Sequence, residues 1–297
     1  MSDWSASFIA VDWGTTNRRA YLLDASGRVV ADMEDDQGVT AIPPGGFAAA
    51  VDAIRQRLGD HPMLLAGMIG SNRGWCEAAY VACPADLGRL AEHVVALDGA
   101  APLIVPGLSY VEGARGDVMR GEEVQIFGLM AMEGAPQGLT VCHPGTHTKW
   151  ATTSSDTITG FRTVMTGELF ALLREHSILA PLLAGKTQTG DVFLSGIDKG
   201  FAGCDLAAEL FSLRAGVLLN LLPSEEALPL ANGLMIGADL RAGLAWSGAE
   251  EEIIVLGNPS LTKLYAAGLQ RVGRRCRSVD GATAFAAGMH AIRGALA

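Results

Sequence analysis

The sequence predicts an α/β protein built from two related lobes, and three observations lead to this expectation. A buried strand, Phe8–Asp12, runs into the turn Asp-x-Gly-Thr-Thr and then straight into a second strand. The same shape returns at a constant offset, so that Phe8–Val30 overlays Leu139–Phe161 without a gap and Gly14 falls on Gly145. Glycine supplies 37 of 297 residues, which suits many tight strand-to-helix turns. Two such hairpins half a chain apart predict two lobes that close on one nucleotide.

The first lobe is expected to open with a three-strand meander, because short apolar runs alternate with polar turn residues. Gly46–Leu58 has apolar residues at helical spacing and predicts a helix. Gly116–Glu133 carries an amphipathic pattern. The expected strands of this lobe are Phe8–Asp12, Asn17–Leu23, Val29–Met33, Met63–Gly67 and Leu103–Pro106.

The segment Gly134–Gly138 is the predicted boundary, since a Pro/Gly break precedes the second hairpin. We therefore expect an N-terminal lobe of residues 1–133 and a C-terminal lobe of residues 134–297, with the terminal helix at the hinge. The second lobe has one further predicted strand, Ile253–Leu256. Its predicted helices are Gly167–His176, residues 205–222, Gly233–Ala245, Leu261–Leu269 and Asp280–Leu296.

Charge and cysteine content exclude several functional classes. The formal charge of −10 and the pI near 5.0 argue against a general nucleic-acid or membrane-surface binder. The five cysteines contain no C-x-x-C pair, which favours neither a disulfide framework nor a zinc site. No basic start with an apolar signal core and no apolar run of about 20 residues is visible. We expect a soluble, cytoplasmic protein.

The two hairpins carry residues suited to a metal-bound polyphosphate. Asp12 can hold Mg²⁺, Gly14 lets the backbone approach phosphate, and Thr15 and Thr16 can donate hydrogen bonds. A simple hairpin is the alternative, because D-x-G-T is common in loops. The second copy replaces the acid with His143-Pro144, so it would bring mainly its own turn residues to the phosphates. These residues are Gly145, Thr146, Thr148 and Lys149.

One segment imitates a nucleotide-binding motif. Ala180–Thr187, APLLAGKT, resembles a Walker A loop, but its first glycine is alanine and it follows a helix-like stretch instead of a strand. A helix C-terminus at Gly185 explains it better. His143 and His147 are four residues apart, yet the intervening Pro144-Gly145 forbids a helical metal site, so His147 is interpreted as a turn residue.

Phosphoryl transfer needs a carboxylate to accept the proton of the attacking hydroxyl. The densest acidic cluster holds Asp117, Glu122 and Glu123 around Arg120. A negatively charged helix N-terminus is the alternative interpretation of this cluster. Several arginines stand beside apolar or glycine-rich turns, which favours a small anionic substrate. These arginines are Arg18, Arg19, Arg73, Arg120 and Arg162.

The hairpins resemble the phosphate-1 and phosphate-2 loops of the sugar kinase, actin and heat-shock ATPase superfamily. Gly257-Asn258-Pro259 falls where that superfamily has its adenosine loop. More narrowly, the chain resembles the 2-dehydro-3-deoxygalactonokinase family along nearly its whole length. The matching stretches, in order, include VDWGTTNRRAYLLD, GMIGSNRGW, GDVMRGEE, PGTHTKW, TVMTGELFALLREHS and IGADLRAG.

The resemblance implies an actin-like ATPase fold of two ribonuclease H-like lobes with a central cleft. It implies ATP and Mg²⁺ as cofactors and phosphorylation of the 6-hydroxyl of 2-dehydro-3-deoxy-D-galactonate, in galactonate and galactose catabolism. Glu122 or Glu123 is then favoured over Asp117 as catalytic base, and Gly257 with Asn258 would approach the adenosine. The substrate candidates are Asn17, Arg18, Arg73, Arg120 and Glu168.

Other functions stay open at this point. A phosphatase or exopolyphosphatase of the same superfamily would also bind Mg²⁺ and phosphate. An ATP-driven interaction protein would need assembly surfaces for which 297 residues leave little room. A kinase of another 2-keto-3-deoxy sugar acid would differ only in scattered loop contacts, and a homodimer is compatible with each of these.

Overall fold

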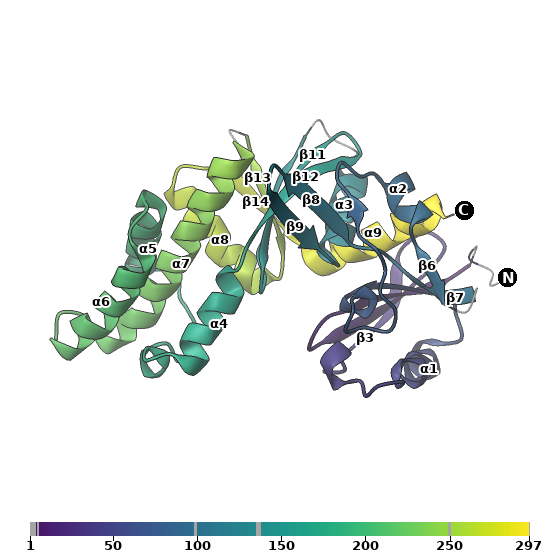
Figure 1. Cartoon of the computed structure of the whole chain (residues 1–297), viewed down its shortest axis with the longest axis horizontal. Coiled ribbons are helices and arrows are strands. Elements are labelled where there is room, and N and C mark those ends of the chain that lie inside the picture. The colour runs from purple at the N-terminus through teal and green to yellow at the C-terminus, as the bar shows by residue number, and fades with distance from the viewer. Residues whose placement is uncertain (1–3, 5, 98–99, 135–137, 249–250, 297) are drawn as a thin grey trace. The chain divides into compact units, whose positions relative to one another are not determined.

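The computed structural model describes residues 4, 6–97, 100–134, 138–248 and 251–296 (Figure 1). The chain forms two compact units. Unit 1 contains Met1–Gly138, Thr153–Gly160 and Gly281–Ala297, and unit 2 contains Leu139–Thr152 and Phe161–Asp280. The sequence placed the boundary at Gly134–Gly138, of which residues 135–137 lie outside the described part of the chain.

Unit 1 is built on a mixed sheet of order β3-β2-β1-β4-β7-β6. The first strand, β1, is antiparallel to β2 and parallel to β4, which places the Asp-x-Gly-Thr-Thr turn at its carboxyl end. The strands are β1 (Phe8–Trp13), β2 (Arg18–Leu23), β3 (Val29–Asp35), β4 (Met63–Gly67), β6 (Val95–Leu97) and β7 (Ala100–Ile104). A smaller sheet of order β5-β8-β9 joins Val81–Ala82, Leu108–Glu112 and Arg115–Met119.

The C-terminal helix belongs to unit 1, whereas the sequence placed it with the second lobe, at the hinge. It packs on α3 through two glycines: a Cβ on Gly128 would lie 1.8 Å from the Ala284 carbonyl oxygen, and one on Gly288 would lie 1.9 Å from that of Val124. Only glycine allows backbones to approach so closely. The helices of unit 1 are α1 (Phe47–Leu58), α2 (Leu87–Glu92), α3 (Glu122–Glu133) and α9 (Gly281–Ala295), with two 3-10 turns, η1 (Val39–Ala41) and η2 (Met68–Gly70).

Unit 2 repeats the arrangement with a sheet of order β12-β11-β10-β13-β14. The strands of this sheet are β10 (Thr140–His143), β11 (Thr148–Ser154), β12 (Thr157–Val164), β13 (Ile253–Gly257) and β14 (Cys276–Asp280), of which the segment Thr153–Gly160 belongs to unit 1. The helices of unit 2 are α4 (Thr166–His176), η3 (Ala180–Leu182), α5 (Asp191–Ala202), α6 (Leu206–Leu218), α7 (Ser224–Ser247) and α8 (Pro259–Arg271).

The prediction of two related lobes is confirmed by the pairing of the strands. In each sheet a three-strand antiparallel meander is followed by two strands parallel to its first strand: β1 is parallel to β4 and β4 to β7, while β10 is parallel to β13 and β13 to β14. The two turns differ by one residue. Four residues separate the pair Trp13–Arg18, whereas five separate His143–Lys149.

Several elements were absent from the prediction, and the amphipathic segment Gly116–Glu133 is helical only in part. The strand β14 has a largely polar sequence, CRSVD, and α5 and the β8–β9 hairpin were not recognised. The helix Gly233–Ala245 extends to Ser224–Ser247 and includes Pro229. Within Gly116–Glu133, the first residues pair with β8 as strand β9, and the helix begins only at Glu122 after Gly121, whose φ is 106°. None of the described helices is long and apolar enough to span a bilayer.

Candidate active site

The phosphate-1 loop of unit 1 is tied down by its own backbone. The Gly14 N–H donates to the Asn17 carbonyl at 2.9 Å, and the carbonyl oxygens of Thr15 and Thr16 accept from the backbone N–H groups of Thr40 and Gly38. A Cβ on Gly38 would lie 2.4 Å from the Thr15 oxygen, so glycine is required there. The side chains of Thr15, Thr16 and Asn17 are exposed. The loop therefore offers fixed backbone and free hydroxyl groups to a ligand.

Asp12 lies at the end of β1, beside a pair of glycines. A Cβ on Gly67 would lie 3.5 Å from Asp12 Oδ1, and one on Gly121 would lie 3.3 Å from the Gly67 Cα. Burial raises the pKa of Asp12 to about 6, the positive charge of Arg19 opposes the rise and the negative charge of Glu122 adds to it. Asp12 and Glu122 are thus neighbouring carboxylates, and Arg19 offsets their negative charge only in part. A divalent cation bound there would neutralise the remaining charge.

The three carboxylates of the acidic cluster lie in two different elements: Asp117 is in β9, and Glu122 and Glu123 begin α3. Both carboxylate oxygens of the fully buried Glu123 accept from the Gly121 N–H, at 2.8 and 2.7 Å. Glu122 is half-buried, and its Oε2 accepts from the Arg120 N–H at 3.0 Å. Asp117 lies in β9, paired with Tyr110, so its interpretation as part of a helix N-terminus is wrong. That interpretation holds for Glu122 and Glu123, which form the first turn of α3.

We expect Glu123→Gln to change how stability depends on pH. Burial, with the nearby Glu122 charge, raises the pKa of Glu123 to about 8. The protonated form therefore stabilises the fold fully below the unfolded pKa near 4.5, and this contribution is lost as pH rises through about 8. The glutamine variant should show a flatter decline in the free energy of unfolding between pH 5 and 8, measured by urea titration. An unchanged pH profile would contradict the assignment.

The four predicted substrate residues of unit 1 differ in their availability. Arg18 is 3% exposed and forms a bidentate ion pair with Asp35 (Nε–Oδ1 3.1 Å, Nη2–Oδ2 2.7 Å), while its Nη1 donates to the Ala50 carbonyl, so we assign it a structural role. Arg73 is exposed, as is Asn17, and within the described part of the chain the Arg73 guanidinium makes no hydrogen bond.

Arg120 is held in place with part of its hydrogen-bonding capacity unused. Its Nη2 donates to the Ala78 carbonyl at 2.7 Å, and its guanidinium lies 4.3 Å from the Tyr80 ring centroid. Its Nε and Nη1 are buried without a partner among the described residues. Buried N–H groups without acceptors are costly, which makes this position suited to an anion.

The phosphate-2 loop of unit 2 lies against the N-terminus of α4. The Glu168 N–H donates to the Thr146 carbonyl at 2.8 Å, and the Glu168 carboxylate pairs with His147 Nε2. This pairing gives Glu168, predicted to touch substrate, a partner on the loop itself. A Cβ on Gly167 would lie 2.2 Å from the Gly145 carbonyl oxygen, so the approach depends on glycine.

Gly167→Ala should therefore displace the phosphate-2 loop. We expect the KM for ATP to rise about tenfold or more, because the methyl group overlaps the backbone of Gly145. Steady-state kinetics at saturating acceptor measure this change. Gly294→Ala is the control, because a Cβ there meets nothing within 4 Å. Equal KM values in the two variants would show that the loop does not bind nucleotide.

Thr148 and Lys149 were predicted as phosphate ligands, and both are buried. Thr148 is fully buried, with its hydroxyl 2.9 Å from the Tyr265 hydroxyl. Lys149 is 4% exposed, and its Nζ donates to Thr163 Oγ1 at 2.9 Å. The five-residue turn shifts the strand register, and β11 begins at Thr148, so both side chains belong to the strand. Gly145 and Thr146 remain at the turn.

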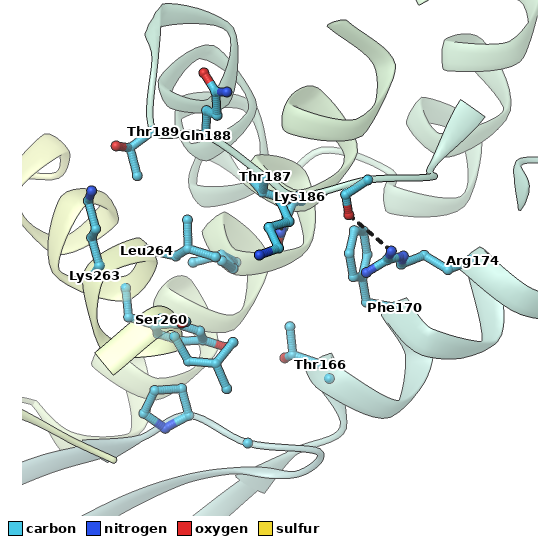
Figure 2. A pocket seen from close by; sticks show the side chains of 18 residues that line it. Thr166, Phe170, Arg174, Lys186, Thr187, Gln188, Thr189, Ser260, Lys263 and Leu264 are labelled. Atoms are coloured by element: carbon cyan, nitrogen blue, oxygen red, sulfur yellow. Dashed lines mark hydrogen bonds between the residues drawn. The ribbon is translucent and has the colours of Figure 1, made fainter. Parts of the chain in front are cut away.

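Unit 2 contains a cavity of about 730 Å³, within the size range of small-molecule sites. It is lined by one end of the phosphate-2 loop, the start of α4, the segment 185–189, α7 and α8 (Figure 2). Apolar side chains supply much of the wall, and Arg174, Lys186 and Lys263 add three cationic groups. The lining residues are Pro144, Gly145, Thr166, Gly167, Phe170, Arg174, Gly185, Lys186, Thr187, Gln188, Thr189, Asn232, Ile236, Ser260, Leu261, Lys263, Leu264 and Tyr265.

The segment that imitates a Walker A loop lies in this cavity wall. Gly185 has a φ of 105° and follows the short η3, so a strand-to-helix phosphate loop is absent from the described segment, but Lys186 and Thr187 line the cavity. Arg174 Nη2 donates to the Gly185 carbonyl at 3.1 Å, and Asn232 Nδ2 donates to Thr187 Oγ1 at 2.7 Å. Figure 2 shows this segment across the cavity from Ser260 and Lys263 of α8.

The predicted adenosine loop begins the helix that supplies another part of the wall. Asn258 is the N-cap of α8, where its side-chain oxygen accepts from the Ser260 N–H at 2.9 Å. Gly257 has a φ of 144°, and a Cβ there would lie 3.6 Å from the Pro144 oxygen. These two residues position α8, while Ser260 and Lys263 line the cavity. Among the described residues, no group of three or more metal-ligating side chains occurs.

Comparison with known proteins gives a consistent result. The model of the 2-keto-3-deoxy-galactonokinase family matches residues 12–292. The 2-dehydro-3-deoxygalactonokinase of Escherichia coli (strain K12) is 36% identical over 295 residues, covering 99% of each chain. A crystal structure from Sinorhizobium meliloti, assigned provisionally to the same kinase, is 34% identical with a TM-score of 0.90 over 96% of this chain and 97% of that chain.

A more distant solved structure shares only the fold. The activator of the 2-hydroxyisocaproyl-CoA dehydratase from Clostridium difficile, with bound ADPNP, is 10% identical, with a TM-score of 0.54 over 97% of this chain and 95% of that chain. The similarity extends over both units, which agrees with the predicted two-lobed α/β fold of the actin-like ATPases.

Proposed function

The chain belongs to the 2-keto-3-deoxy-galactonokinase family, and we propose from this membership that it transfers the γ-phosphoryl group of ATP to the 6-hydroxyl of 2-dehydro-3-deoxy-D-galactonate. The enzyme is a sugar-acid kinase that acts in galactonate breakdown. A cytoplasmic location and a homodimer remain predictions. The observation that carries the proposal is the family match over residues 12–292, which includes the turns of both phosphate hairpins.

The nucleotide is assigned to the cavity of unit 2. Its apolar wall suits a purine base, and its polar groups suit a ribose. Gly145 lies at the end where the exposed phosphate-2 loop would meet phosphate oxygens. The cations Lys186, Lys263 and Arg174 complement the nucleotide charge.

Unit 1 supplies the reaction chemistry in this proposal. Asp12 would hold Mg²⁺, directly or through water, and the bound ion would neutralise charge developing on the phosphates. Glu122 is the carboxylate best suited to accept the proton of the substrate hydroxyl, because it is half-buried next to Asp12, whereas Glu123 is fully buried and occupied by the Gly121 N–H. Asp117 lies in a separate sheet.

The acidic group of the substrate is assigned to arginines of unit 1. Arg120 has buried N–H groups without a partner among the described residues, and Arg73 has an exposed guanidinium, so each can offer hydrogen bonds to a carboxylate.

A substrate analogue that lacks the 6-hydroxyl tests directly whether this hydroxyl is the phosphate acceptor. We expect it to bind without producing ADP, and ADP release at the rate of the true substrate would overturn the assignment.

Lys186→Met should weaken nucleotide binding, because it removes a cation from the cavity wall while keeping the apolar stem. We expect the KM for ATP to rise about tenfold, corresponding to one charge-assisted hydrogen bond. Steady-state kinetics with ATP varied check this result. The matched control is Lys199→Met on α5, where the exposed lysine pairs with Glu209. Unchanged ATP kinetics in Lys186→Met would remove this lysine from the site.

A further inference from the structure

A single buried carboxylate, Asp239 of α7, joins three other elements of unit 2. Its Oδ1 accepts from the Trp150 indole N–H at 2.8 Å. Its Oδ2 accepts from the hydroxyl groups of Thr166 and Tyr265, each at 2.5 Å. Asp239 is 1% exposed, so its carboxylate has lost its contact with water. The three donors replace the hydrogen bonds that water would otherwise make to it. The phosphate-2 hairpin, the start of α4 and the helix after the adenosine loop therefore share one anchor.

The contacts around Asp239 determine where the hydroxyl hydrogens point. The hydrogen bonds around Asp239 favour its ionised form, which only accepts hydrogen bonds, so in that form the hydrogens of Thr166 and Tyr265 are both directed at Asp239. Thr148 Oγ1 lies 2.9 Å from the Tyr265 hydroxyl and also contributes to the hydrogen bonding around Asp239. The oxygens of Thr166 and Tyr265 then have only lone pairs to offer other groups.

The chemistry of these groups keeps this arrangement in place. Burial raises the pKa of Asp239, while the hydrogen bonds from Thr166, Tyr265 and Trp150 oppose that rise. Burial and the neighbouring Asp239 charge hold the pKa of Tyr265 well above its usual value, so its hydroxyl stays protonated. Close packing adds rigidity, because a Cβ on Gly243 of α7 would lie 1.9 Å from the Trp150 ring.

Thr166 and Tyr265 both line the cavity assigned to the nucleotide. We propose that Asp239 is a positioning residue for the nucleotide, which fixes these two hydroxyl oxygens as hydrogen-bond acceptors for the donor groups of a nucleoside. The ligand class that such a wall would take is one rich in hydroxyl or amino donors, as a ribose or an adenine is. This inference rests on the proposed function, which places the nucleotide in this cavity.

Asp239→Asn tests the inference with little change in shape. The new amide must direct its oxygen toward the donor-only Trp150 N–H, and its NH₂ then faces the two hydroxyls and reverses their hydrogens. We expect the KM for ATP and the Kd for ADP, the latter by calorimetry, to rise about tenfold. The KM for the sugar acid should stay within twofold. A parallel rise in both KM values would overturn the positioning role.

Two further variants decide the question if Asp239→Asn fails to fold. Thr166→Val and Tyr265→Phe each remove one of the two oxygens, and we expect each to raise the Kd for ADP about fivefold or more. Thr262→Val is the matched control: Thr262 is 4% exposed on α8, bonded to the Pro259 carbonyl and outside the cavity lining. Nucleotide binding as tight in Thr166→Val and Tyr265→Phe as in Thr262→Val would overturn the inference.

The failures of the two proposals can be distinguished. Suppose that the unmodified enzyme phosphorylates the sugar acid, and that Asp239→Asn, Thr166→Val and Tyr265→Phe bind ADP as tightly as the unmodified enzyme does. Then only the role of Asp239 is wrong. If the unmodified enzyme binds no ADP, the nucleotide assignment itself is wrong and the inference falls with it.

ATP analogues lacking the 2′- or 3′-hydroxyl, and inosine triphosphate in place of ATP, identify the nucleoside group that donates to Thr166 or Tyr265. The analogue that lacks it should lose affinity in the unmodified enzyme but little in Asp239→Asn, and equal losses in both would contradict the role.

Discussion

Replacing Asp12 with asparagine should lower kcat by about 10³-fold while leaving the protein folded. Asp12 is the second-last residue of β1, beside the phosphate-1 loop, where its carboxylate would organise the metal ion. The measurement is steady-state ADP production at saturating ATP and substrate, together with the Mg²⁺ concentration needed for half-maximal rate. Asp32→Asn is the control, since Asp32 is an exposed carboxylate of the same sheet.

Stability should change in the opposite direction from activity. The pKa of Asp12 is raised from 3.8 to about 6, mainly by burial. The stability contributed by its protonated form is complete below pH 3.8 and is lost as pH rises through about 6. At pH 7.5 the asparagine variant should therefore have a Tm equal to or above that of the unmodified protein. Full activity in Asp12→Asn would remove its role, and a large fall in Tm would show a structural role instead.

Glu122→Gln should lower kcat by about 10²- to 10⁴-fold, the usual effect of losing a general base. Glutamine keeps the oxygen that accepts from the Arg120 N–H, so α3 should begin as before. The KM for ATP should change little, because only proton acceptance is removed. Steady-state kinetics with each substrate varied separate these effects.

Glu123→Gln is the matched control for the base, because the two residues are adjacent in the first turn of α3. The raised pKa of Glu123, about 8, makes a neutral amide a close substitute near pH 7. We expect kcat to stay within about threefold of that of the unmodified enzyme. If Glu123→Gln loses activity and Glu122→Gln retains it, the two roles are reversed. Two active variants would direct the search to Asp117.

Those parts of the candidate site that depend on local pattern could be proposed from the sequence. The strand ending at Asp12 and the glycine turn are contiguous, so their chemistry can be recognised from adjacent residues. The same holds for the acidic turn of α3. The burial of Thr148 was not foreseen, because a constant offset cannot show that the second turn has one more residue. In a strand, one residue is enough to change which side chains are buried.

The hydrogen bonds that hold the cavity wall together could not be predicted from sequence motifs. Thr187 is joined to Asn232, and Asp239 to Trp150, Thr166 and Tyr265, through contacts between residues far apart in sequence. No local periodicity marks such pairs. The helix α5 could have been found, since Phe193 and Ile197 are four residues apart, but its Gly196 and Gly200 lower the helical signal. Those glycines allow close packing on α7, where a Cβ would meet backbone at 2.5 and 2.2 Å.

The most direct test of the central claim, that this protein is a sugar-acid kinase, is a coupled ADP-release assay over a panel of 2-keto-3-deoxy sugar acids. We expect ADP to appear only when a sugar acid is added, with the highest kcat/KM for 2-dehydro-3-deoxy-D-galactonate and a lower value for its gluconate epimer. ADP release at the same rate without any sugar acid would show that the protein is a hydrolase and would contradict its assignment as a sugar-acid kinase.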